Sequence, residues 1–195
     1  MMRSESEPVG EFLVLTGFGH GHLFPFMELC NRIAFHNRRA TFVVFSHLYS
    51  SIHPSFLENP LVQVVQVHSP SPRPGLPRNL QLEIYEKLAE TVEGLLSRSP
   101  RPVCALVNTL MLLNWTKEIF KRFGVPIAAL SVSGACSPCM EVASYKARAE
   151  TIGQGEVRPL PGLPEEMALS VVNIKRRPFG PPTPTAGNSK GAGAP

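Results

Sequence analysis

A glycine-rich turn directly after a short apolar run is the feature that most constrains how this chain of 195 residues can fold. The apolar run is Phe12-Leu13-Val14-Leu15, and the turn that follows, Gly17-Phe18-Gly19-His20-Gly21-His22-Leu23-Phe24-Pro25, opens a helical pattern. Glycines let a backbone turn sharply and approach a ligand closely, and a helix start offers unpaired N–H groups. We therefore expect His22 to face a crevice at the carboxyl end of a strand, where open α/β sheets bind their ligands.

The rest of the chain alternates between strand and helix patterns. We expect strands at 11–16, 40–45, 62–67, 103–107 and 127–132, and helices at 22–36, 80–97, 112–123 and 139–149. Pro25 then falls in the first turn of its helix, where proline is tolerated. Such alternation predicts an α/β fold with a doubly wound, Rossmann-like parallel sheet covered by helices.

Composition divides the chain into one domain and two tails. Residues 1–10 are polar and acidic and are expected to be disordered, while residues 11–177 form the domain. From residue 178 to residue 195 the sequence is Pro, Gly, Ala, Ser and Thr with almost no apolar bulk, which predicts a second disordered segment.

The glycine-rich turn resembles the N-terminal signature of plant-type UDP-sugar-dependent glycosyltransferases, a Gly-x-Gly-His-x-x-Pro motif followed by a helix. Further segments resemble that family in the same order. They are Pro102-Val103-Cys104-Ala105-Leu106-Val107, Trp115-Thr116, Phe123-Gly124-Val125-Pro126, Ser131-Val132-Ser133-Gly134-Ala135-Cys136 and Leu160-Pro161-Gly162-Leu163-Pro164-Glu165-Glu166-Met167.

The resemblance implies a role for particular residues. His22 would be the general base that takes a proton from an acceptor hydroxyl, whose oxygen then attacks the anomeric carbon of a UDP-sugar with inversion, without a metal. Imidazole suits this role because its unperturbed pKa lies near ~6.5. Asn108 stands where the family has the aspartate that orients this histidine, and all 15 acidic residues of the chain are glutamates. The acceptor-binding positions implied are Phe18, Gly19, His20, Thr109, Ser133 and Gly134.

The resemblance also implies what lies outside this chain. The family has two facing domains of the GT-B type, and 195 residues suffice for about one domain of ~100–200 residues. The family's donor-binding signature has no counterpart, so we expect the acceptor-binding half only, a truncated form inactive alone. UDP-sugar would be a co-substrate, the transferred sugar would be a hexose such as glucose, and no cofactor would be tightly bound.

Charge and cysteine content argue against several other classes. The net charge is +4, yet the basic residues form no stripe interleaved with aromatics, so nucleic acid is not an expected partner. No apolar run approaches the ~18–20 residues of a membrane span. Four cysteines in a chain of this size do not suggest a disulfide scaffold, and a cytoplasmic location is expected.

Three alternatives remain open from the residues. His20 and His22 could bind one metal in a hydrolase barrel, although that fold needs ~250 residues. Cys136 and Cys139 form a Cys-x-x-Cys pair before an expected helix, as in thiol oxidoreductases. A lone acceptor-side domain could also bind a small lipophilic hydroxyl compound, or associate through its domain-docking face, without catalysis.

Overall fold

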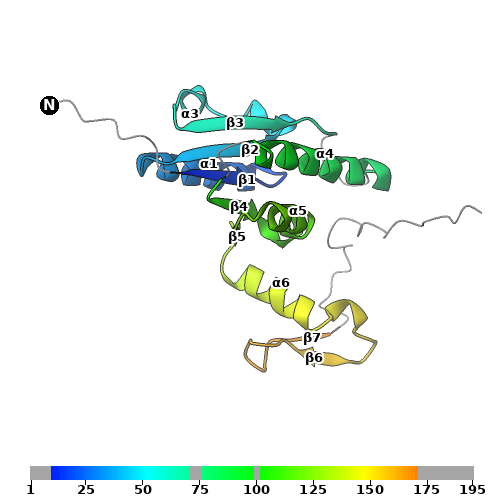
Figure 1. Cartoon of the computed structure of the whole chain (residues 1–195). Helices are drawn as coiled ribbons and strands as arrows, with labels where there is room; N and C mark the ends of the chain where they lie inside the picture. The colour runs from blue at the N-terminus through cyan, green and yellow to red at the C-terminus, as the bar shows by residue number, and fades with distance from the viewer. Residues whose placement is uncertain (1–9, 71–75, 99–101, 171–195) are drawn as a thin grey trace, which may run out of the picture. The chain divides into compact units, whose positions relative to one another are not determined.

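The computed structural model describes residues 10–70, 76–98 and 102–170 (Figure 1). These residues fall into two compact units that divide after Ala128, and each unit is described by itself. The two tails expected to be disordered, 1–10 and 178–195, lie outside the described residues, apart from Gly10.

The first unit contains the strands of one sheet and the helices that alternate with them. Its elements are β1 (Glu11–Leu15), α1 (His20–Phe35), β2 (Arg39–Phe45), α2 (Ser46–Tyr49), α3 (Pro54–Leu57), β3 (Val62–Val67), α4 (Arg78–Leu96), β4 (Cys104–Asn108), α5 (Thr109–Phe123) and β5 (Ile127–Leu130), whose last two residues pass into the second unit. The expected alternation of strand and helix is therefore confirmed.

The five strands form one parallel sheet in the order β3-β2-β1-β4-β5. The chain moves outward from β1 to β2 and β3, then returns through α4 to β4 on the other side of β1. This reversal of direction makes the sheet doubly wound, as predicted. It also places the topological switch point, where such sheets bind ligands, between β1 and β4.

The two faces of the sheet bury different sets of side chains, because alternate residues of a strand point to opposite sides. Odd-numbered residues such as Leu13, Val43 and Val107 join the core that includes residues of α4 and α5. Even-numbered residues such as Phe42 lie on the other face, where Phe42 packs edge-on against Phe56 of α3. Helix α1 contacts β1, β2 and β3. Both faces are thus covered by helices.

Helix α1 begins earlier than the sequence indicates. It starts at His20 instead of residue 22, because Gly19 has an extended backbone and its carbonyl accepts bonds from the N–H groups of His22 (2.9 Å) and Leu23 (3.1 Å). The expectation that Pro25 lies in the first turn is therefore wrong: Pro25 lies inside the helix. The buried side of α1 consists of Leu23, Phe26, Cys30 and Ala34.

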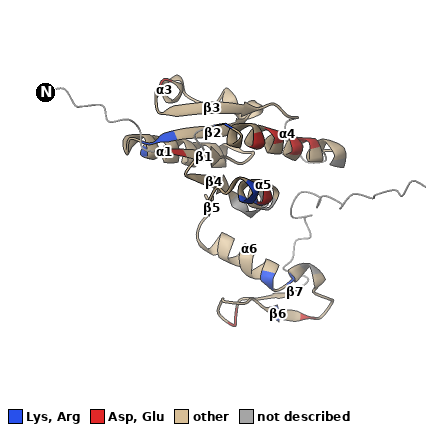
Figure 2. Ribbon diagram, viewed as in Figure 1, with Lys and Arg blue, Asp and Glu red and all other residues tan. Residues whose placement is uncertain are grey.

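Helices α4 and α5 contact each other and carry opposite charges at one point of contact. Acidic side chains gather along α4 (Figure 2), and Glu93 of α4 forms an ion pair with Arg122 of α5. Both side chains are about half exposed, and pairs of this kind contribute little, at most about 1 kcal/mol. The packing of α4 and α5 therefore depends on their apolar residues, among them Leu88, Leu112 and Phe120.

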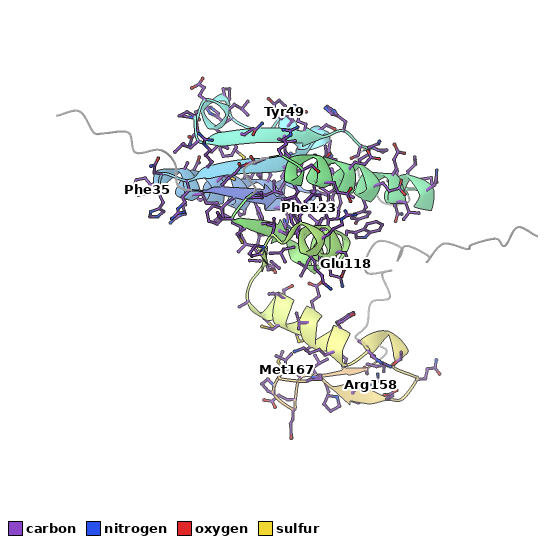
Figure 3. The ribbon with its side chains drawn as sticks, viewed as in Figure 1. Phe35, Tyr49, Glu118, Phe123, Arg158 and Met167 are labelled. Atoms are coloured by element: carbon purple, nitrogen blue, oxygen red, sulfur yellow. The ribbon has the colours of Figure 1, made fainter. Side chains whose placement is uncertain are left out.

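The second unit contains α6 (Cys136–Lys146), a 3-10 turn (Ala149–Thr151) and an antiparallel pair, β6 (Val157–Pro159) and β7 (Ala168–Ser170). Arg158, labelled in Figure 3, connects these parts. Its guanidinium donates to the carbonyls of Ala147 (2.8 Å) and Arg148 (3.0 Å) and to Thr151 Oγ1 (2.9 Å). One side chain on β6 thus holds the end of α6.

No helix within the described ranges is both long and apolar enough to cross a bilayer.

The end of α5 provides a test of the backbone geometry. Gly124 ends this helix in the left-handed region (φ +68°), where a side chain is strained, while a Cβ there would meet no atom within 4 Å. Gly124→Ala should therefore lower the free energy of unfolding by about 1–2 kcal/mol, and Gly124→Asn by less, because asparagine tolerates this conformation. Urea unfolding measures both values, and an alanine variant as stable as the parent would contradict the assignment.

Candidate active site

The candidate site lies where β1 and β4 end side by side. The parallel register pairs Leu15 with Val107, so the next residues, Thr16 and Asn108, occupy neighbouring strand ends. Both side chains are buried, with exposed fractions of 1% and 0%. They are even-numbered and lie on the same face of the sheet. The start of α1, which carries His22, follows the turn that leaves β1. The switch point therefore gathers a hydroxyl, an amide and an imidazole.

Gly17 lies between the amide and the imidazole. A Cβ at this position would come within 2.9 Å of Asn108 Nδ2 and within 3.1 Å of His22 Cγ. Contacts this short mean that both side chains pack against the bare backbone of residue 17. The absence of a side chain at Gly17 therefore brings His22 and Asn108 to the same place.

The polar atoms at this point are buried and lack partners among the described residues. They are Thr16 Oγ1, His22 Nδ1, Asn108 Nδ2 and Asn108 Oδ1. Nδ1 of His47, in helix α2 directly after β2, is also buried and lacks a partner there. Buried polar groups in proteins nearly always have a hydrogen-bond partner, and each unpartnered one costs about 1–3 kcal/mol. A cluster of them at the switch point is the arrangement expected of a site that works on a ligand.

The imidazole of His22 is half-buried, and its Nδ1 is buried without a partner among the described residues. Because the residue as a whole is half-buried, part of it is open to solvent beside the glycine-rich turn. A ring held in this way at the carboxyl edge of the sheet is suited to exchange a proton with a ligand.

Aromatic rings lie beside the glycine-rich turn. The ring of Phe18 lies 4.5 Å from that of Phe45 and 5.7 Å from that of Tyr85, and Tyr85 stacks on Trp115 at 4.7 Å between centroids. Burial raises the pKa of Tyr85 to about 12. His47 also stacks on Phe45, and its Nε2 lies 2.9 Å from the carbonyl oxygen of Phe18. His47, in the short helix α2, therefore supports the glycine-rich turn.

The remaining predicted site residues are spread over the chain. His20 is exposed, and its Nε2 lies 2.9 Å from Ser51 Oγ. Gly19 precedes α1. Thr109 is the first residue of α5 and does not lie in the loop that the sequence suggests. This helix begins three residues before the expected residue 112. Ser133 and Gly134 are exposed residues of the second unit. The first unit therefore brings together only His22, Asn108 and the turn residues.

The two chemical alternatives fit this arrangement less well. The fold is an open sheet and not a closed barrel, and no three potential ligands among the described His, Cys, Asp and Glu residues come together as a metal site. Cys136 and Cys139 are free, exposed thiols in the first turn of α6, and in the sequence they follow all five strands of the large sheet. Cys30, by contrast, is buried, which raises its pKa to about 12.

A cavity of about 240 Å³ lies at the other end of the strands. Residues of β1, β2 and β3 line it, and the hydroxyl of Thr41 donates there to the carboxylate of Glu11. It lies at the amino ends of the strands and takes no part in the chemistry at His22.

Sequence reasoning did not single out Gly17, Thr16 or His47. Thr16 could have been found by extending the expected strand pairing by one residue. The contact at Gly17 could not, because it depends on where two side chains from distant parts of the sequence meet.

Gly17→Ala tests the close approach. Its Cβ would push against the buried Asn108 and the base of the His22 ring, so we expect the free energy of unfolding to fall by about 1–3 kcal/mol. Gly21→Ala is the matched control, because a Cβ at Gly21 meets nothing within 4 Å and alanine favours the helix by about 0.5–1 kcal/mol. Denaturant titration of both variants gives the comparison; equal effects would show that Gly17 is not crowded.

Comparison with known proteins identifies the fold. No protein-family model and no curated protein matches the sequence. Among solved structures, LpCGTa in complex with UDP is similar over 80% of this chain and 37% of its own, with 24% identity and a TM-score of 0.62. TcCGT1 in complex with UDP is similar over 85% and 37% of the two chains, with 17% identity and a TM-score of 0.65.

A third structure, Medicago truncatula UGT71G1 complexed with UDP-glucose, is similar over 85% of this chain and 40% of its own, with 18% identity and a TM-score of 0.63. The chain thus spans well under half the length of these neighbours. From the order of its strands, the helices on both faces and these likenesses, the chain has the fold of the N-terminal half of a two-domain GT-B glycosyltransferase, as in the UDP-glycosyltransferases.

Proposed function

We propose that this chain is the acceptor-binding half of a UDP-sugar-dependent glycosyltransferase, with His22 as its general base. The observation that carries the proposal is the position of His22 at the switch point, where its half-buried ring and the buried amide of Asn108 both lie against Gly17. The likeness in fold to structures that hold UDP or UDP-glucose supports it.

The proposed step is an inverting displacement. Nε2 of His22 takes the proton of an acceptor hydroxyl while the hydroxyl oxygen attacks the anomeric carbon of the sugar. The bond between that carbon and the UDP oxygen breaks, and UDP leaves with the bonding electrons. The ring becomes an imidazolium, which then loses its proton to solvent or product. The transferred sugar is proposed to be a hexose, with glucose as the first to test.

Asn108 lowers the efficiency of this step. A carboxylate at this position would stabilise the imidazolium, whereas an amide carries no charge. In the serine-protease triad, exchanging the orienting aspartate for asparagine costs about 10⁴ in turnover. We take that factor as an upper guide to how much Asn108, in place of an aspartate, lowers the turnover of this chain.

The acceptor is proposed to be a small lipophilic compound with a hydroxyl group. The rings of Phe18, Tyr85 and Trp115 support this proposal. Phe18 belongs to the turn before His22, Tyr85 contacts Phe18, Trp115 stacks on Tyr85, and both Phe18 and Trp115 are only partly buried. Flat apolar ligands favour such aromatic surroundings. All four cysteines are free thiols, in keeping with action in the reducing cytosol.

A donor-binding domain is needed in addition to these residues. The described strands and helices correspond to about two-fifths of the neighbours' chains at most. We therefore propose that the 195 residues by themselves bind an acceptor without transferring sugar. Binding without catalysis is the second candidate function, and the amide at position 108 favours it because the buried charge partner of the base is lacking.

His22→Ala tests the base in a chain fused to the donor-binding domain of UGT71G1. With UDP-glucose and a panel of phenolic acceptors, we expect glucosyl transfer to fall by about 10²–10⁴. His36→Ala, an exposed position at the other end of α1, is the matched control and should leave the rate unchanged. Product formation is followed by liquid chromatography. An undiminished rate in His22→Ala would overturn the assignment.

Asn108→Asp tests the charge partner in the same fusion. We expect transfer to rise, by up to about 10⁴, because the carboxylate stabilises the imidazolium. Asn108→Leu, of similar size but without polar atoms, should stay at or below the rate of the parent. Circular dichroism confirms that each variant is folded, since position 108 is fully buried. Equal rates for the parent and the aspartate variant would contradict the proposal that the missing charge at position 108 limits transfer.

A further inference from the structure

We propose that His47 is a positioning residue for His22. By donating a hydrogen bond from Nε2 to the Phe18 carbonyl, it fixes the glycine-rich turn from which α1 starts and so sets where the His22 ring stands. This role rests on the proposed function in taking His22 as the base. The hydrogen bond joins two segments that are neighbours only in the fold, the turn after β1 and the helix α2 after β2.

The hydrogen bond to Phe18 is the first observation. Nε2 of His47 lies 2.9 Å from the carbonyl oxygen of Phe18. A carbonyl oxygen can only accept, so in the neutral ring Nε2 carries the hydrogen and Nδ1 the lone pair. The N–H groups of His22 and Leu23 both bond to the Gly19 carbonyl instead of that of Phe18. His47 thus supplies the partner that the first turn of α1 does not give to Phe18.

The packing of the His47 ring is the second observation. The ring stacks on Phe45 at 6.1 Å between centroids and 28° between planes, and the ring of Phe45 lies 4.5 Å from that of Phe18. Phe45 is buried at the end of β2, and Leu48, the residue after His47, is buried as well. Phe18 is therefore held twice, by Phe45 at its side chain and by His47 at its carbonyl.

The path from Phe18 to His22 is short. Gly19 follows Phe18 directly, and its carbonyl accepts hydrogen bonds from the N–H groups of His22 (2.9 Å) and Leu23 (3.1 Å). No side chain caps this end of α1, and a glycine does not restrict its own backbone as other residues do. The position of the helix start therefore depends on contacts from outside the turn, and His47 provides one within four residues of His22.

A second hydrogen bond reaches the same turn from the residues after α2. Nε2 of His20 lies 2.9 Å from Ser51 Oγ, but His20 is exposed, so water competes for this pair. His47 is half-buried and its ring is stacked, so its donor is held in one place. We therefore assign the positioning to His47 and not to Ser51.

NMR of the 195-residue chain tests the positioning without any need for transfer activity. His47→Phe keeps a ring that can stack on Phe45 and removes the donor, whereas His47→Gln restores an NH₂ donor at the reach of Nε2. We expect the ring signals of His22 and the amide signal of Gly19 to move in His47→Phe. They should return to the parent positions in His47→Gln. The His22 signals are assigned by their loss in His22→Ala.

His53→Phe is the matched control. The His53 ring caps α3, where Nδ1 accepts from the N–H of Ser55 at 3.3 Å. Loss of a helix cap lowers stability, so this variant is destabilised without a change at the glycine-rich turn. Its His22 and Gly19 signals should stay in place, which separates positioning from a general loss of stability.

The same variants give a kinetic result in the fusion with the donor-binding domain of UGT71G1. We expect kcat per folded molecule to fall by about 10–10²-fold in His47→Phe, because a small misplacement of a catalytic group has an effect of this size. The KM for UDP-glucose should stay unchanged. His47→Gln should keep most of the kcat of the parent, and His53→Phe all of it.

Unmoved His22 signals in a folded His47→Phe chain would overturn the proposal. Signals that move as far in His47→Gln as in His47→Phe would also overturn it, because the hydrogen bond would then not be what holds the turn. Should His47→Phe fail to fold, the parent chain still decides. Long-range proton–nitrogen spectra at about pH 8.5, where imidazoles are neutral, must show the hydrogen of His47 on Nε2. A hydrogen on Nδ1 would mean that the bond to Phe18 is not made.

The outcomes separate this role from the proposed function. Transfer that survives His22→Ala would refute the proposed function, yet displaced His22 signals in His47→Phe would still support His47 as the residue that positions the ring. Transfer that depends on His22, together with unmoved signals in His47→Phe, would refute the positioning alone.

Discussion

The parallel pairing of β1 with β4 is the constraint on which the candidate site depends. It joins segments about ninety residues apart, and the register that pairs Leu15 with Val107 fixes Thr16 and Asn108 as neighbours at the carboxyl edge. Because this is also the place where the strand order reverses, the helices that follow β1 and β4 leave on opposite sides and open the edge between them. The imidazole of His22 on α1 and the amide of Asn108 then both pack against the bare backbone of Gly17.

The sequence predicted the elements of this fold well, because its signals are local. Apolar runs and helical periodicity placed the five strands and the principal helices, and the 62–67 strand matches its observed bounds. The errors lie at helix ends. Helix α6 spans Cys136–Lys146 instead of 139–149, and α1 and α5 begin two and three residues early, since Gly19 and Asn108 have extended backbones that pass directly into the helix. Nothing in their side chains marks these positions, because neither makes a capping hydrogen bond.

The site was only partly predictable. His22 and Asn108 were found through a motif and through the absence of aspartate from the chain. The roles of Gly17, Thr16 and His47 depend on contacts between turns, and no spacing in the sequence encodes these contacts. Ser133 and Gly134 lie in the second unit. Their part in acceptor binding stays a prediction. The structure adds that the side chain of Asn108 is wholly buried, so solvent cannot supply hydrogen-bond partners to its amide.

Pro25 inside α1 has a consequence for how the imidazole is held. Proline has no N–H, so the carbonyl of Gly21, four residues earlier, lacks its helical donor. In the turn that carries His22, the Gly19 carbonyl accepts hydrogen bonds from His22 and Leu23, whereas the Gly21 carbonyl has no helical N–H to accept from. The turn that carries His22 is therefore held by one helical hydrogen bond fewer than the rest of α1, and it is the part of the helix that is displaced at the lowest cost.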